Sequence, residues 1–154
     1  MLTRHLPSAA VLIAAALQLG CFPDYFPRRQ ARDVTDSQII GRWQLRPASA
    51  ERFLAYPVPA GTKSTAAFSS GGRCSLTNFV DNGDRYSGKG TWEVGRESDR
   101  GGSPSSVLEI RLSNSSGGRP LVFRFSFSRE HKTLILWQYI GDPDSREYIE
   151  YERI

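Results

Sequence analysis

Cys21 and Cys74 carry the most distinctive chemistry in this chain of 154 residues. Two cysteines are too few for a disulfide scaffold, and they lack the paired spacing of a zinc site. Cys74 alternates with Leu76 on one face of a predicted strand, so we expect a buried, inert thiol. Cys21 follows an apolar run at the N-terminus. If the protein is exported without further processing of Cys21, a disulfide between the two cysteines is the alternative.

The other residues that could support catalysis or metal binding are more simply explained as turn residues. His131 lies in a charged turn, and no Cys or His stands at ligand spacing from it. Asp81 with Asp84, and Asp142 with Asp144, lie at predicted strand ends, where Asp, Asn, Gly and Pro favour turns. We therefore expect no catalytic site, no metal and no cofactor.

The composition limits the domain count and the class of partner. Lys and Arg number 20 against 16 Asp and Glu, a small excess that is spread along the chain. This pattern argues against nucleic-acid binding, which favours a basic block with interleaved aromatic residues. A chain of this length supports one hydrophobic core, so we expect one folded domain, and we expect it to be a monomer.

Residues 1–20 have the pattern of a secretory signal peptide. Arg4 precedes an apolar run at residues 9–17, which is about half of the roughly 20 apolar residues that span a bilayer. Cleavage before Cys21 leaves an apolar segment of normal length, whereas cleavage within residues 14–16 leaves almost none. The sequence therefore predicts export, with Cys21 as the first residue of the mature chain.

The Leu19-Gly20-Cys21 ending resembles a bacterial lipobox, with Gln18 where that pattern usually has Leu. The resemblance implies that Cys21 is acylated and then becomes the N-terminus. Two or three acyl chains would anchor the protein firmly to membrane lipid. Phe22 is not the Asp that retains such proteins in the inner membrane, so the resemblance favours the outer membrane in a cell that has two.

A tether is expected at residues 21–37, and the folded domain at residues 38–154. The tether contains two prolines and no sustained apolar period. Its three arginines, Arg28, Arg29 and Arg32, lie against anionic head groups in one interpretation and are solvated linker charges in the other.

Alternating apolar and polar residues predict eight strands in the folded domain. The first strand carries Trp43 and the fourth carries Trp92. The eight predicted strands are residues 39–46, 63–69, 73–80, 86–94, 107–113, 121–127, 133–140 and 146–154. A short helix is expected at 47–56, tight turns at 70–72 and 81–84, and a long polar loop at 95–106. This order predicts an all-β, eight-stranded antiparallel up-and-down barrel.

The triplet Gly41-Arg42-Trp43 on the opening strand resembles the Gly-x-Trp signature of lipocalins and related calycin barrels. This resemblance implies that Trp43 closes one end of the barrel and that an arginine from a late strand, Arg153, lies against its ring. The stretch at residues 88–92 is similar to bacterial lipocalin-like domains of uncharacterised role.

Seven aromatic residues on predicted inward faces either line a ligand cavity or fill the core. They are Trp43, Tyr86, Trp92, Phe123, Phe125, Phe127 and Tyr151. If they line a cavity, the protein binds a small apolar ligand at the barrel mouth, near the 95–106 loop. If they fill the core, the barrel is a protein-interaction or inhibitor module of the envelope, which would use that loop and the outward-facing Ile40 and Val122.

Overall fold

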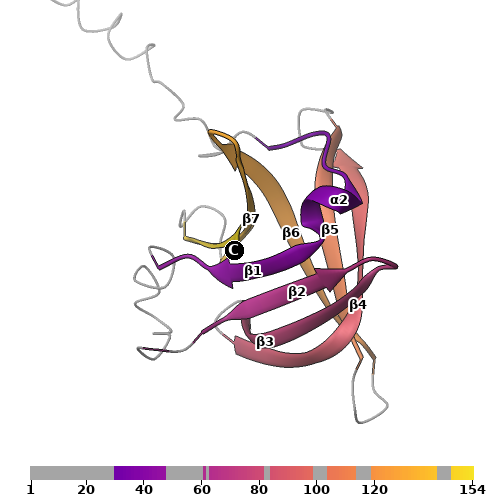
Figure 1. Cartoon of the computed structure of the whole chain (residues 1–154), viewed down its shortest axis with the longest axis vertical. Coiled ribbons are helices and arrows are strands. Elements are labelled where there is room, and N and C mark those ends of the chain that lie inside the picture. Colours follow the sequence, from indigo (N-terminus) through magenta and orange to yellow (C-terminus); the bar gives the residue numbers. More distant parts are fainter. Residues whose placement is uncertain are drawn as a thin grey trace, which may run out of the picture.

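Eight antiparallel strands pair in sequence order and close into a barrel (Figure 1). The structure is a computed structural model that describes residues 30–47, 61, 63–81, 84–98, 104–113, 119–141 and 147–154. The predicted signal peptide, Cys21 and residues 22–29 of the predicted tether lie outside these residues. The predicted all-β, up-and-down barrel is confirmed.

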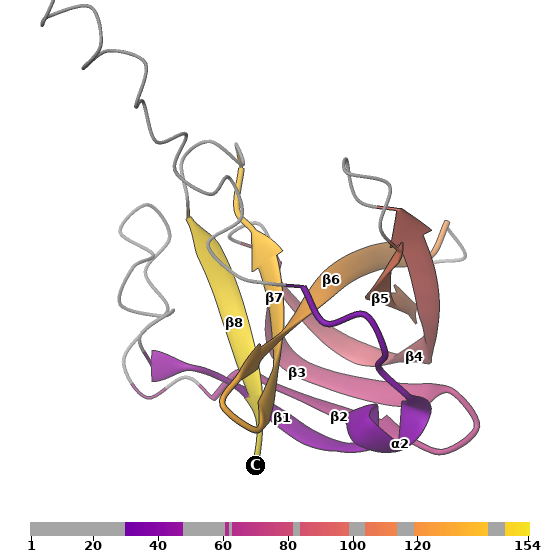
Figure 2. The same cartoon turned by 90° about the horizontal axis from the view of Figure 1, so that it is seen from above.

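The strands follow the chain around the barrel without crossing over (Figure 2). They are β1 (Gly41–Leu45), β2 (Thr65–Ser69), β3 (Arg73–Asp81), β4 (Asp84–Ser98), β5 (Pro104–Leu112), β6 (Leu121–Glu130), β7 (Thr133–Tyr139) and β8 (Tyr148–Arg153). Closure comes from the pairing of the first strand with the last, where Trp43 is opposite Arg153 and Leu45 is opposite Tyr151. No edge of the sheet is left open between these two strands.

Two tight connections lie where the sequence predicts them. Between β2 and β3, Gly71 and Gly72 have φ values of 74° and 67°, which a residue with a side chain rarely adopts. Between β3 and β4, Asp81 pairs with Asp84, so two residues connect these strands. Those two residues, 82 and 83, lie outside the described part of the chain.

A short helix, which was not expected from the sequence, precedes the first strand. Helix α2 (Asp36–Ile39) begins after Thr35, whose backbone N–H donates to Oε1 of Gln38 at 3.0 Å. This exchange is part of a capping box, which satisfies backbone donors at a helix start. The predicted opening strand at 39–46 is therefore too long, because Ile39 belongs to the helix. The helix expected at 47–56 lies, apart from Pro47, outside the described residues.

The predicted loop at 95–106 is wrong, because most of this stretch is paired strand. Gly95 is opposite Val107, and the pairing continues to Ser98 opposite Pro104. All four side-chain positions at 95–98 are exposed. A strand that is exposed on both faces has no apolar alternation, so its composition resembles that of a loop.

The segment before α2, which was assigned to the tether, fills a gap between β5 and β6. Ala31 donates its N–H to the carbonyl of Phe127 at 2.8 Å and accepts from the N–H of Ser106 at 3.3 Å. Ser106 Oγ donates to the carbonyl of Arg32 at 2.7 Å and accepts from the N–H of Val34 at 3.2 Å. The ordered barrel domain therefore extends upstream to residue 30.

Strand β7 is buried on both faces at residues 134–137, where the sequence is apolar at every position. Leu136 faces the interior and is fully buried, while Ile135 and Trp137 face outward and are only 0% and 2% exposed. The ring of Tyr139 lies 5.1 Å from the ring of Trp137, edge to face. This part of the outer surface is therefore packed and not solvated.

Candidate functional site

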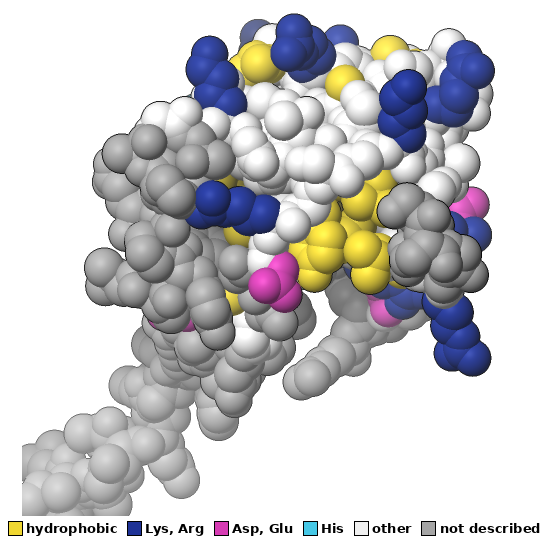
Figure 3. Space-filling model, turned by 90° about the horizontal axis from the view of Figure 1, so that it is seen from below, with side chains coloured by type: hydrophobic (Ala, Val, Ile, Leu, Met, Phe, Trp, Pro, Cys, Tyr) yellow, Lys and Arg dark blue, Asp and Glu magenta, His cyan; other side chains and the backbone are white. Residues whose placement is uncertain are grey.

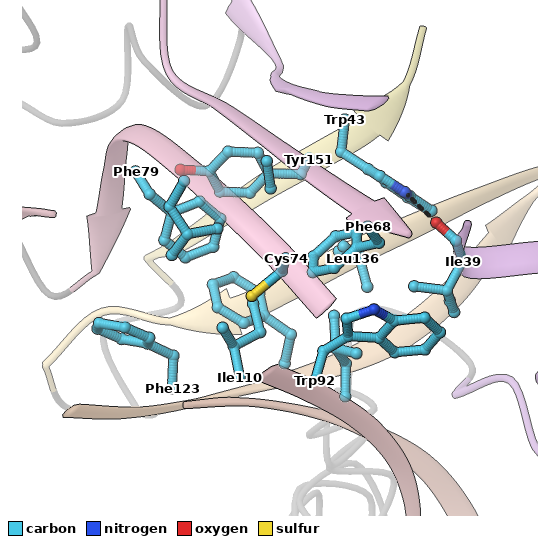
Figure 4. Close-up of a cluster of buried hydrophobic side chains, with 14 of the residues drawn as sticks. Ile39, Trp43, Phe68, Cys74, Phe79, Trp92, Ile110, Phe123, Leu136 and Tyr151 are labelled. Carbon is cyan, nitrogen blue, oxygen red and sulfur yellow. Dashed lines mark hydrogen bonds between the residues drawn. The ribbon is translucent and has the colours of Figure 1, made fainter. Parts of the chain in front are cut away.

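Phe79 is the centre of an aromatic cluster inside the barrel (Figure 4). Its ring stacks on Tyr151 with 4.6 Å between centroids and an angle of 20°. It also contacts Phe125 at 5.3 Å and Phe123 at 5.9 Å, both edge to face. Each such pair contributes roughly 0.5 to 1.5 kcal/mol beyond the burial of its area. These contacts fix the positions of the four rings relative to one another.

Phe79 was not predicted to face inward, and a bulge explains why it does. Cys74 and Leu76 face the interior, so strict alternation places residue 78 inside. Instead Asn78 adopts a φ of 47°, and the pairing with β4 shifts register between Leu76 and Phe79. One extra residue in the strand reverses the faces that follow it. Asn tolerates this left-handed conformation better than most residues, and it is the one signal in the sequence.

The hydroxyl of Tyr151 is held by two hydrogen bonds. It accepts from the N–H of Val80 at 2.8 Å and shares a hydrogen bond with Ser64 Oγ at 2.7 Å. The side chain is fully buried. Burial raises the pKa of Tyr151 above its ordinary value, although the bonds with Ser64 and Val80 oppose the rise. The phenol is therefore a neutral structural group at physiological pH.

Of the remaining residues predicted to line a cavity, Trp92 and Phe127 are buried in the core, and Tyr86 lies at its partly buried margin. Trp92 packs edge to face on Phe68 at 5.7 Å, and its Nε1 donates to the carbonyls of Ser69 and Arg73. Phe127 is fully buried in the same core. Tyr86 is only partly buried and lies 4.9 Å from Phe123. The aromatic residues predicted from sequence therefore lie in the core or against it. The rings that contact other rings of the chain are those of Tyr86, Trp92, Phe123, Phe125 and Tyr151.

Cys74 is a free, buried thiol in this core, as the sequence predicts. Figure 4 shows its sulfur among the rings and aliphatic side chains of the cluster. Burial raises the pKa of Cys74 to about 11, and a backbone hydrogen bond involving Gly90 opposes the rise only in part. Because the thiolate is the nucleophile, this thiol is inert at neutral pH.

The closure residues named from the lipocalin resemblance meet at the seam between β1 and β8. Trp43 is fully buried, and its Nε1 donates to the carbonyl of Ile39 at 2.8 Å. Arg153 is the register partner of Trp43, and its guanidinium lies against Gly41. Stacking of Arg153 on the ring of Trp43 stays a prediction.

On the outer face, Glu109 stands between two arginines. Nε of Arg111 donates to Oε1 at 2.6 Å, and Nε of Arg124 donates to Oε2 at 3.0 Å. The bond from Arg111 is the largest cause that lowers the pKa of Glu109; burial opposes it, and Arg124 adds to the lowering. A surface hollow of about 260 Å³ lies beside Glu109, lined also by Glu93, Gly95, Arg96, Glu97, Val107 and Arg124. Both acidic and basic side chains line this hollow, and Glu109 is already bonded to two arginines. This arrangement does not single out a catalytic acid, base or nucleophile among the lining residues.

Arg46, which directly follows β1, contacts two strands, β6 and β8, on another part of the barrel. Its Nη1 lies 2.7 Å from Glu130 and 3.1 Å from Glu150, and its Nε lies 3.4 Å from Glu152. Burial lowers the pKa of Arg46, but the bond with Glu130 and the three carboxylate charges raise it overall. The contact ties the end of β6 to β8 and neutralises carboxylates there.

Among the polar residues with possible catalytic roles, Asp81 and Asp84 are register partners at the β3–β4 turn. His131 is an exposed turn residue with φ 54°. Asp81 accepts a hydrogen bond from Gln138, and burial raises its pKa; Asp84 is exposed. Asp142 and Asp144 lie outside the described residues. Within the described ranges, no three His, Cys, Asp or Glu side chains are grouped as metal ligands.

Among the helices of the described residues, none has both the length and the apolar character needed to cross a membrane. Comparisons with protein-family models, with curated proteins and with solved structures find no match to this chain.

Proposed function

We propose that this protein is an exported lipoprotein, acylated on Cys21, whose barrel binds another protein of the cell envelope through its surface. The contacts of Phe79 with Phe123, Phe125 and Tyr151 carry the proposal. These rings occupy the interior that a ligand would otherwise share. The outer surface is then the part of the domain that is available for recognition.

The anchor is supported by the sequence alone. A charged N-terminus, a short apolar run and Leu19-Gly20-Cys21 follow one another, and Phe22 favours the outer membrane. Replacement of Cys21 by Ala should move the protein from the membrane fraction to the soluble fraction. Retention of Cys21→Ala in the membrane would remove the lipoprotein part of the proposal.

The start of β6 is the described surface best suited to a protein partner. Leu121 and Val122 are 43% and 49% exposed. Figure 3 shows that apolar side chains gather on one face of the molecule, with charged side chains of both signs on the same face. An apolar centre with a charged rim is typical of protein interfaces.

Affinity capture from envelope extract tests this surface. The bait is the lipidated full-length protein, compared with Leu121→Glu/Val122→Glu. The matched control is Ser75→Glu/Thr77→Glu, which adds the same charge at two exposed positions of β3. We expect a partner that the wild type and the control retain and the β6 variant loses. If the wild type, the β6 variant and the control capture the same envelope proteins, the start of β6 is not the interface.

A second candidate function is binding of a small apolar ligand at the end of the barrel where β4 begins, which is opposite to the end expected from the sequence. It is favoured by Tyr86, which is only partly buried although its ring contacts Phe123. Titration with a fluorescent fatty acid tests it. Saturable binding with one site per chain that Tyr86→Ser abolishes would support this function, and binding that does not saturate would exclude it.

A further inference from the structure

The position at which the chain enters the barrel is fixed by the structure. Gln30 forms a β-bridge with Ser128, and Ala31 is bonded to both β5 and β6. Ala31 and Val34 are each only 8% exposed. The residue to which the anchor leads is therefore held beside the end of β6 and not on a loose tether.

The β6–β7 hairpin tip begins one residue beyond that bridge. Arg129, His131 and Lys132 are all exposed there, and the turn closes with Glu130 opposite Thr133. Arg32 is exposed on the entering segment. Of the nearby acids, Glu130 is bound by Arg46 at 2.7 Å, whereas Asp33 and Asp36 are exposed on the entering segment. The tip itself therefore presents cations.

We propose that Arg129 and Lys132 at the β6–β7 tip, together with Arg32, contact anionic head groups of the membrane that holds the acyl chains. This inference rests on the proposed acylation of Cys21. Only eight residues, 22–29, separate Cys21 from Gln30. Even a fully extended chain of this length reaches only about 30 Å. The anchor therefore keeps Gln30, which lies next to the tip, within about 30 Å of the bilayer surface.

The consequence is a preferred orientation of the barrel. Each basic side chain near an anionic surface strengthens binding about fivefold, and the attraction decays within a Debye length. Odd-numbered strands begin at the end that carries the tip, and even-numbered strands end there. The start of β6, with Leu121 and Val122, then belongs to the opposite end and points away from the membrane.

Distance-dependent quenching on vesicles tests the orientation. The lipidated full-length protein carries a fluorophore at Thr133→Cys, beside the tip, or at Ser113→Cys, at the opposite end; both positions are exposed. Vesicles contain phosphatidylcholine with or without phosphatidylglycerol, and a quencher is attached to a head group. The unlabelled Cys74 is buried, and protein without an introduced cysteine measures any background from it.

We expect stronger quenching at position 133 than at 113 on anionic vesicles, and loss of the difference in 1 M salt, where the Debye length is about 3 Å. Arg129→Glu/Lys132→Glu should remove about half or more of the quenching at 133. The control Lys63→Glu/Arg119→Glu, at the opposite end, should not. Equal quenching at both positions, or the same result on neutral vesicles, would overturn the inference.

Flotation of the same samples separates the two claims. If the wild type floats with vesicles and Cys21→Ala does not, acylation of Cys21 is supported. The quenching result then tests only the contact with head groups. If neither chain floats, the lipoprotein proposal fails, and the head-group contact fails with it.

Discussion

The guanidinium of Arg153 lies against the backbone of Gly41 at the seam of the barrel. A Cβ at position 41 would come within 2.8 Å of Nε of Arg153, and Gly41 has a φ of 140°. The residue therefore has two separate reasons to be glycine, a backbone conformation and a close approach. Both occur where the first strand pairs with the last.

Gly41→Ala should lower the free energy of unfolding by about 2 kcal/mol, within the range for a strained residue at this φ. Urea unfolding measures the change. In the Arg153→Ala background the cost should be smaller but not zero, because the backbone strain remains. An unchanged stability of Gly41→Ala would show that the seam is not closed as described.

Gly90→Ala should lower the free energy of unfolding by more than Gly41→Ala does. The expected loss is about 3 kcal/mol, in the upper part of the range for overpacked substitutions. A Cβ at position 90 would lie 2.0 Å from the carbonyl oxygen of Arg111, a backbone atom of β5 that cannot move aside. Gly95→Ala on the same strand is the matched control, because no atom lies within 4 Å of its Cβ. Thermal melting that ranks the two variants equally would contradict the β4–β5 register.

Tyr151→Phe should destabilise the protein by about 1 to 3 kcal/mol. The substitution leaves the rings in place but removes the acceptor of the buried Val80 N–H. Chemical unfolding at neutral pH gives the value, with Tyr86→Phe as the control at a partly buried position. If both variants lose the same small amount, the Tyr151 hydroxyl does not bond the backbone of β3.

Alkaline pH should weaken the fold partly through Cys74. Its folded pKa is about 11 against an ordinary value of 9.0, so below pH 9 the thiol is protonated in both states and its contribution to stability is complete. Between pH 9 and 11 the unfolded state ionises first, and roughly 2 to 3 kcal/mol is lost.

The pH dependence of Cys74→Ala isolates this contribution. The variant should be less stable than the wild type at pH 7, because it leaves a cavity, and the gap should narrow as the pH rises to 11. Urea unfolding of both proteins across this range provides the test. A gap that stays constant would mean that the thiol of Cys74 is not buried.

The barrel could be predicted because most of its strands have one solvent-exposed face and one buried face. On β6, Phe123, Phe125 and Phe127 are buried, and they alternate with more polar residues. This period of two identifies both the strand and its inward side. The outward-facing Val122 was also predicted and is exposed, whereas Ile40 is partly buried.

The sequence could not predict the parts of the fold in which the burial of a residue does not follow the local alternation of apolar and polar residues. The bulge at Asn78 reverses the faces of β3 and brings Phe79 into the centre of the cluster. The outer end of β4, at residues 95–98, pairs with β5 although it is exposed on both faces. Residues 30–34 could not be placed from their own sequence, because they are held by hydrogen bonds to Phe127 and to the backbone and side chain of Ser106, which lie far away in sequence.

Native mass spectrometry of the lipidated protein, purified from its own membranes, tests most directly whether the barrel is filled by its own side chains. The account predicts a mass equal to the mature chain plus the covalent acyl groups on Cys21. A further apolar molecule, bound one per chain and released when the protein unfolds, would contradict it.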